Sequence, residues 1–199
     1  MFAKRLTIIL LFASLAVSCG RHIPRTEPGQ PGVYHSLNVK LTIKLQQEQR
    51  KGSGKIIWFY DRDRGKMLFL SPLNQVYFEL LVEGERALLI SRKEKKFWSG
   101  RFSALLRRLW NLDVRYSQLL ALVSEGTIPR QTDYQKQLVF NIEKGQDGGQ
   151  PSKIEISNHD VHLKLKISRK KTRQGLLTFD PKLGALQRVG IEEILELQY

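Results

Sequence analysis

The pattern of apolar and polar residues beyond residue 36 predicts a series of short β-strands. Residues 37–45 alternate over nine positions, which is the period of a half-buried β-strand. Short apolar-rich segments bounded by turn residues predict four more strands, at residues 55–60, 66–70, 75–82 and 87–90. The predicted turns between them lie at residues 51–54, 61–65, 71–74 and 83–84. Short strands with turns every ~8–12 residues favour an antiparallel sandwich or barrel.

A helical period replaces this alternation in the middle of the chain. Apolar residues recur every three or four positions in two groups, Phe102, Leu105, Leu106 and Leu109, and then Leu112, Tyr116, Leu119, Leu120 and Val123. Asp113 is placed to cap the second helix, which Gly126 and Pro129 end. Strand patterns resume at residues 135–143, 153–157 and 161–167. The patterns therefore predict a mainly β domain with two inserted helices.

The first nineteen residues have the organisation of an export signal. Lys4 and Arg5 precede an uncharged segment, residues 6–17, which is well short of the ~20 apolar residues that a spanning helix needs. Ala16-Val17-Ser18-Cys19 follows and resembles the bacterial lipobox, in which small residues precede an obligatory cysteine; Ala16 stands where Leu is commonest. The alternative is an ordinary secretory signal that happens to contain a cysteine.

Cys19 is the only cysteine of the chain, so a disulfide within the chain cannot explain it. We therefore predict that residues 1–18 are a signal peptide and that Cys19 carries the lipid anchor. Gly20 rather than Asp follows it, which by resemblance to the enterobacterial sorting rule favours the outer membrane, with the protein facing the periplasm. Residues 20–36 contain three prolines and three glycines and predict a flexible linker, so that 19–36 is anchor plus linker and 37–199 is the folded domain.

The chain is strongly basic, and export changes what this charge implies. The formal net charge is +14, and it falls to +12 when Lys4 and Arg5 leave with the signal peptide. Export excludes nucleic acid as the natural partner, and leaves anionic lipid, lipopolysaccharide phosphates or an acidic protein. Basic residues cluster at 92–96 and 169–173, although each cluster by itself is typical of a solvated loop.

No pattern of an enzyme active site is present in the sequence. It contains no G-x-S-x-G elbow, no phosphate-binding loop and no pair of residues with zinc-ligand spacing. His159 and His162 are three apart in a turn and strand, where such positions face opposite ways. We predict a binding protein that is not an enzyme and has no cofactor beyond the covalent lipid on Cys19.

The order of elements around Ser71-Pro72-Leu73-Asn74 resembles the LolB family of outer-membrane lipoprotein receptors. Apolar strands lead into this turn, and after it come a strand, a Gly turn, the aromatic pair Phe97-Trp98 and two helices that end at residues 126–129. The resemblance covers residues 37–171 and implies a mainly β (α+β) fold, an antiparallel sheet curled into an incomplete barrel with a helical lid over an apolar cavity. It also implies a monomer that takes the acyl chains of lipoproteins from a LolA-like periplasmic carrier and inserts them into outer-membrane lipid.

The resemblance also assigns roles to residues. It makes Leu73 the exposed turn residue that inserts into the membrane, with Asn74 in place of the family's glycine. Candidates for the wall of the acyl-chain cavity are Leu41, Ile43, Trp58, Val76, Phe78, Leu80, Leu105 and Leu119. These residues could equally fill a closed core. Residues from about 172 extend past the family's usual end, with a strand-like segment at 175–179, and look more like the soluble LolA carriers. The alternative function is an envelope lipoprotein of the same fold that binds lipid, glycolipid or protein in a structural or sensory role.

Overall fold

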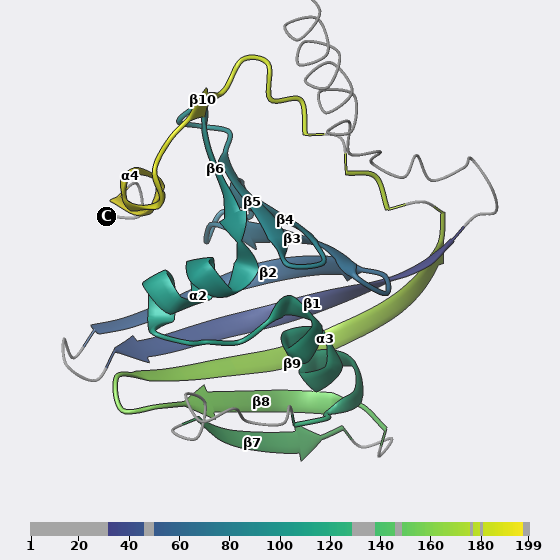
Figure 1. Cartoon of the computed structure of the whole chain (residues 1–199). Helices are drawn as coiled ribbons and strands as arrows, with labels where there is room; N and C mark the ends of the chain where they lie inside the picture. The colour runs from purple at the N-terminus through teal and green to yellow at the C-terminus, as the bar shows by residue number, and fades with distance from the viewer. Residues whose placement is uncertain are drawn as a thin grey trace, which may run out of the picture. The chain divides into compact units, whose positions relative to one another are not determined.

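Ten strands in the described part of the chain form one sheet (Figure 1). The computed structural model describes residues 32–45, 50–128, 138–145, 149–175, 177–179 and 181–196. The predicted signal peptide, Cys19 and most of the predicted linker lie outside the described residues. The strand order is β10-β6-β5-β4-β3-β2-β1-β9-β8-β7, and every neighbouring pair is antiparallel except β10–β6.

The strand bounds agree with most of the predicted strands. The first six are β1 (Val33–Leu45), β2 (Arg50–Tyr60), β3 (Arg64–Leu70), β4 (Val76–Glu83), β5 (Arg86–Ser91) and β6 (Lys96–Arg101). The last four are β7 (Val139–Lys144), β8 (Pro151–Ser157), β9 (Val161–Gln174) and β10 (Gln187–Arg188). The terminal strands of this order, β10 and β7, do not pair with each other, so the sheet is open. The prediction of a mainly β fold with an unclosed sheet is confirmed.

Both predicted helices form, and they lie on the same side of the sheet (Figure 1). The first is α2 (Phe102–Trp110) and the second is α3 (Tyr116–Glu125). Their apolar faces and the inward side chains of the strands form one core.

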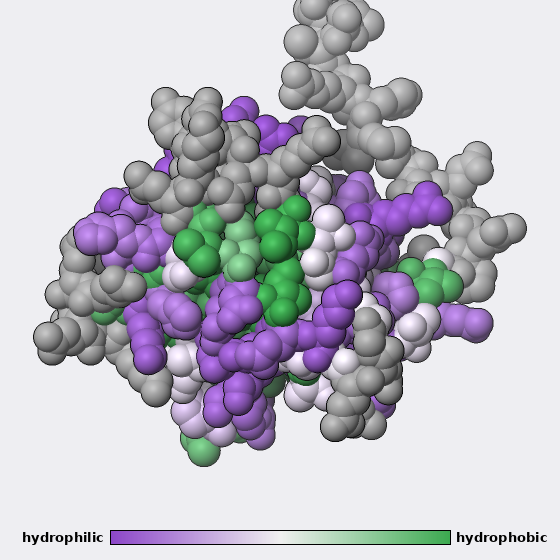
Figure 2. Space-filling model, turned by 90° about the horizontal axis from the view of Figure 1, so that it is seen from below, coloured by the Kyte–Doolittle hydropathy of each residue, from purple (hydrophilic) through white to green (hydrophobic). Residues whose placement is uncertain are grey.

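Seen from below, with the β7 edge toward the viewer, hydrophilic residues cover most of the surface around a hydrophobic group (Figure 2). None of the described helices is long and apolar enough to cross a membrane.

Tyr116 fastens the start of α3 to the sheet. Its ring is 1% exposed and meets Phe102 edge to face, with ring centroids 5.4 Å apart. Its hydroxyl accepts a hydrogen bond from Nε1 of Trp58 at 3.3 Å. Gly65 in β3 leaves the space that this ring occupies, because a Cβ there would lie 1.9 Å from the Tyr116 hydroxyl oxygen. The position of α3 over the sheet therefore depends on a glycine.

Four local predictions were wrong. Residues 51–54 are not a turn but part of β2, where Gly54 pairs with Leu41. The predicted linker overlaps β1, which begins at Val33 because that strand pairs with β9 as far as Gln174. Residues 177–179 have no regular structure. Asp113 does not cap α3; it forms an ion pair with Arg107, and the N-cap is Arg115, whose backbone N–H donates to Gln118.

The C-terminal segment covers the β6 edge of the sheet. β10 pairs with β6, and α4 (Ile191–Glu196) follows, with Ile194 completely buried in the core. Glu192 pairs with Arg108 of α2 at 2.5 Å, and Glu193 pairs with Lys96 of β6 at 3.0 Å. The part of the predicted extension that lies in β10 and α4 is thus packed on the domain.

Candidate functional site

An apolar cavity of about 670 Å³ lies between the concave side of the sheet and the two helices. This volume is within the ~300–1,000 Å³ of small-molecule sites. The strands contribute Val39, Leu41, Ile43, Gly52, Ser53, Gly54, Ile56, Trp58, Met67, Phe69, Tyr77, Phe78, Leu80, Leu89, Ile156, Leu163 and Leu165. The helices and connecting segments contribute Lys93, Phe102, Leu105, Leu106, Leu109, Trp110, Leu112, Val114 and Leu119. The space above the sheet is therefore not filled by a closed core.

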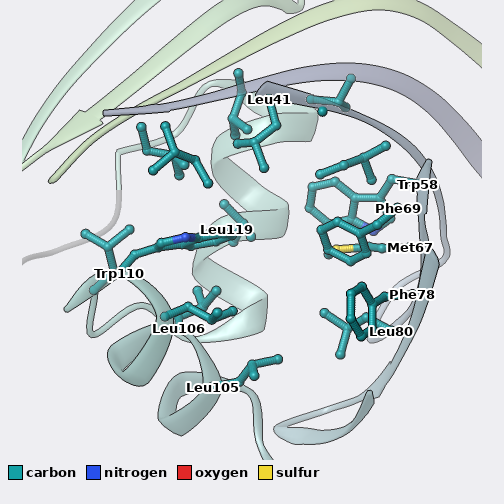
Figure 3. A pocket seen from close by; sticks show the side chains of 18 of the residues that line it. Leu41, Trp58, Met67, Phe69, Phe78, Leu80, Leu105, Leu106, Trp110 and Leu119 are labelled. Atoms are coloured by element: carbon teal, nitrogen blue, oxygen red, sulfur yellow. The ribbon is translucent and has the colours of Figure 1, made fainter. Parts of the chain in front are cut away.

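Seven of the eight predicted wall residues line this cavity. They are Leu41, Ile43, Trp58, Phe78, Leu80, Leu105 and Leu119. Figure 3 shows side chains from the strands on one wall and side chains from the helices opposite them, with the open space between. Alternation in the strands and the helical period in α2 and α3 bring these residues together, because both patterns direct apolar residues to one side. That they hold acyl chains stays a prediction.

Val76 is not in the cavity wall. Its side chain is 43% exposed, whereas its neighbour Tyr77 lines the cavity. The cause is an irregularity in the β3–β4 pairing. Phe69 is paired in register with Phe78, but the next residue, Leu70, is paired with Val76. The extra residue, Tyr77, shifts the alternation by one position, as a β-bulge does. Val76 therefore pairs with Leu70 on the outer face of the sheet.

Several wall residues were missed by sequence reasoning, although some had a signal. Met67 and Phe69 alternate within a predicted strand, and Leu106 and Leu109 belong to the helical pattern of α2. Trp110 had no such signal, because it ends the helix and only its position over the sheet brings it to the cavity.

The exposed lining residues indicate the mouth of the cavity. Gly52, Ser53, Tyr77 and Lys93 line it and are exposed, whereas Leu105 and Leu80 are 1% and 2% exposed. Strand register places the exposed residues at one end of the sheet, where β2 and β4 begin and β5 ends. A Cβ added at Gly52 or Gly54 would meet nothing within 4 Å, so these glycines leave the mouth wide.

The Leu73 turn lies at the same end of the sheet, between β3 and β4. The Leu73 side chain is 80% exposed. The turn is held by hydrogen bonds: the Ser71 hydroxyl oxygen accepts from the backbone N–H groups of Leu73 and Gln75, and Asn74 N–H donates to the Ser71 carbonyl. Asn74 has φ 61°, the left-handed conformation that Asn tolerates better than most residues. A defined turn therefore presents this leucine to the exterior.

The lining offers little beyond apolar contact. Among the described lining residues Lys93 alone is charged, and its side chain is 75% exposed at the mouth. Two tyrosines, Tyr60 and Tyr116, pack in the core beside Trp58, and burial raises the pKa of both, that of Tyr60 to about 12. They are neutral at physiological pH. Within the described residues no group of three His, Cys, Asp or Glu is placed to hold a metal ion.

An open β-sheet with helices over an apolar cavity defines a class of proteins that bind apolar ligands. The family model of outer membrane lipoprotein LolB matches residues 35–138, just over half of the chain, and the chain belongs to the LolB family. The family resemblance noted in the sequence is thereby confirmed, and the family is one of outer-membrane lipoproteins that bind rather than catalyse.

Two solved structures are similar to this chain. A LolA superfamily protein from Nitrosomonas europaea is 12% identical with a TM-score of 0.45, and the match covers 77% of this chain and 90% of that one. A domain described as a candidate outer membrane lipoprotein-sorting protein from Vibrio parahaemolyticus is 12% identical with a TM-score of 0.43, covering 73% and 87%. No curated protein matches the sequence.

Proposed function

We propose that this protein is a membrane-anchored acceptor that receives acylated lipoproteins from a LolA-like periplasmic carrier and inserts them into the outer membrane. The observation that supports it is the open apolar cavity under α2 and α3. In this proposal the lipid on Cys19 keeps the cavity at the membrane, and Leu73 enters the bilayer when cargo is released.

For this transfer, the protein must bind acyl chains more tightly than the carrier does and less tightly than the bilayer does. Burying a methylene group contributes about 0.8 kcal/mol, so an acyl chain moves toward whichever site buries more of it. A cavity with an open mouth leaves part of the chain exposed, whereas a bilayer buries all of it. Transfer to the membrane then needs no covalent step and no added energy source.

Gly54→Phe tests this proposal by narrowing the cavity without removing any native side chain. Residue 54 shares a face with Ile56 and Trp58, both in the wall, and a Cβ there meets nothing within 4 Å. Gly184→Phe is the matched control, since Gly184 is exposed, has the same free space and does not line the cavity.

The assay mixes each variant with a periplasmic carrier loaded with an acylated lipoprotein and measures how much cargo changes partner. We expect Gly54→Phe to lower the transferred amount at least several-fold and Gly184→Phe to leave it unchanged, with equal thermal unfolding temperatures. Equal transfer by both variants would show that the cavity does not hold the cargo. A wild-type protein that takes no cargo at all would favour the structural or sensory alternative.

A further inference from the structure

Three lysines from three neighbouring strands form a straight row on the outer face of the sheet. Lys40 in β1 is paired in register with Lys166 of β9 on one side and with Lys55 of β2 on the other. All three are exposed. Val39 and Leu41, which flank Lys40, line the cavity, so alternation directs Lys40 to the opposite face. The row, Lys166–Lys40–Lys55, spans two strand spacings, or about 10 Å.

No acidic side chain neutralises this row within the described residues. The next lysine along it, Lys153 of β8, contacts Glu143 and also Glu155 at 3.1 Å, and Glu155 contacts Lys164 as well. In the described part of the chain, Lys40, Lys55 and Lys166 have no such carboxylate within ion-pair distance. Like charges directly opposite each other on neighbouring strands are destabilising. An anionic surface placed against the row would remove that repulsion.

The row leads into the exposed Leu73 turn. Lys55 is paired in register with Leu70 of β3, and Leu70 is paired with the exposed Val76 of β4, so all three lie on the same outer face of the sheet. The Lys55 ammonium also donates a hydrogen bond to the Asn74 side-chain oxygen at 3.3 Å, which joins the row to the turn. Positive charges beside a projecting leucine fit a bilayer surface, whose headgroups take the charges while its acyl region takes the leucine.

We propose that the row Lys166–Lys40–Lys55 is an electrostatic docking surface for anionic phospholipid headgroups, which holds the domain with its outer face and the Leu73 turn against the membrane. The surface acts on orientation and is separate from the lipid anchor. The inference rests on the outer-membrane location of the family and not on acyl-chain transfer, so the two proposals can fail independently.

The test uses the lipidated full chain in vesicles and a fluorophore on the outer face. Asn38→Cys carries the dye, since Asn38 is exposed and lies two residues before Lys40 in β1. Ala104→Cys, exposed on α2, is the control position. A nitroxide quencher on the lipid headgroups reports which dye lies at the membrane. Vesicles contain phosphatidylcholine with or without phosphatidylglycerol.

We expect strong quenching at residue 38 and weak quenching at residue 104, only with phosphatidylglycerol, and less of it in high salt. Changing Lys40, Lys55 and Lys166 to Gln should lower the ratio of docked to undocked protein about fivefold per lysine, or about a hundredfold together. The control with equal charge loss is Arg62→Gln with Arg86→Gln and Arg101→Gln. These exposed arginines lie at the other end of the β3–β6 strands, and their loss should leave the quenching unchanged.

Three results would overturn the proposal. The first is equal quenching at the two dye positions, and the second is quenching that does not depend on phosphatidylglycerol. The third is a lysine variant that keeps its quenching but binds an acidic carrier protein less tightly, which would make the row a protein-docking surface. Loss of quenching with normal cargo transfer from a carrier supports the proposal and leaves the acceptor function intact.

Discussion

Gly65→Ala should disturb the attachment of α3 to the sheet. The added Cβ would lie 1.9 Å from the Tyr116 hydroxyl oxygen and 2.6 Å from Cζ of the same ring. The ring is 1% exposed and packed against Trp58 and Phe102, so it has no free space to enter. Overpacking of this kind costs about 1–3 kcal/mol. We expect the free energy of unfolding to fall by that amount.

A double-mutant cycle with Tyr116→Phe separates this clash from other effects. Tyr116→Phe alone leaves the buried Trp58 Nε1–H without its acceptor, which costs about 1–3 kcal/mol. In the presence of Gly65→Ala the same change also removes the atom at 1.9 Å, although the contact at 2.6 Å remains. The double variant should therefore be about 1 kcal/mol more stable than the sum of the single effects predicts.

Urea denaturation followed by tryptophan fluorescence measures each free energy. Gly52→Ala is the matched control, because it also adds a methyl group to a strand glycine but meets nothing within 4 Å. It should be neutral or stabilise by up to about 1 kcal/mol. If Gly65→Ala is as stable as Gly52→Ala, or if the effects in the double-mutant cycle are additive, then the close contact of the Tyr116 ring with Gly65 does not hold α3 in place.

Two further predictions concern single side chains. Leu73→Ala removes three carbons from a side chain that is 80% exposed, so membrane insertion should weaken by about 2 kcal/mol, or roughly 30-fold, and cargo delivery to vesicles should slow. The control is Val139→Ala, at a residue that is 64% exposed on β7. Equal cargo delivery by the two variants would show that Leu73 has no role in insertion. Tyr60→Phe deletes a buried hydroxyl that has no hydrogen-bond partner among the described residues, so it should be neutral or slightly stabilising. Because burial raises the Tyr60 pKa from 10.0 to about 12, the wild type should lose about 1 kcal/mol more than the variant between pH 8 and about pH 11, where the unfolded phenol ionises first; identical pH profiles would contradict this.

The sequence predicted the fold well where one pattern controlled the structure. Alternation and short apolar segments between turn residues located most strands, and the helical period located α2 and α3, because burial of side chains in one core imposes these patterns. The prediction is wrong at residues 51–54, where two glycines indicate a turn although pairing with β1 keeps them extended. Glycine indicates conformational freedom, and only the neighbouring strand decides how that freedom is used.

The site was predictable in its composition but not in its details. Seven wall residues followed from alternation and helical spacing, yet Val76 did not, because a bulge at Tyr77 shifts the register and leaves no pattern in the sequence. The lysine row depends even more on strand register than the position of Val76 does. Lys166 is more than a hundred residues from Lys40 and Lys55 along the chain, and only the strand register shows that the three lie in one row.

Photo-crosslinking from the cavity tests the acceptor account. A photoreactive residue at Leu105, which lines the cavity and is 1% exposed, would be compared with the same residue at Ala104, its exposed neighbour on α2. We expect position 105 to crosslink to an acylated lipoprotein supplied by its carrier and position 104 not to do so. A lipoprotein without acyl chains should crosslink at neither position. Equal crosslinking at both positions, or none at position 105 with acylated cargo, would contradict it.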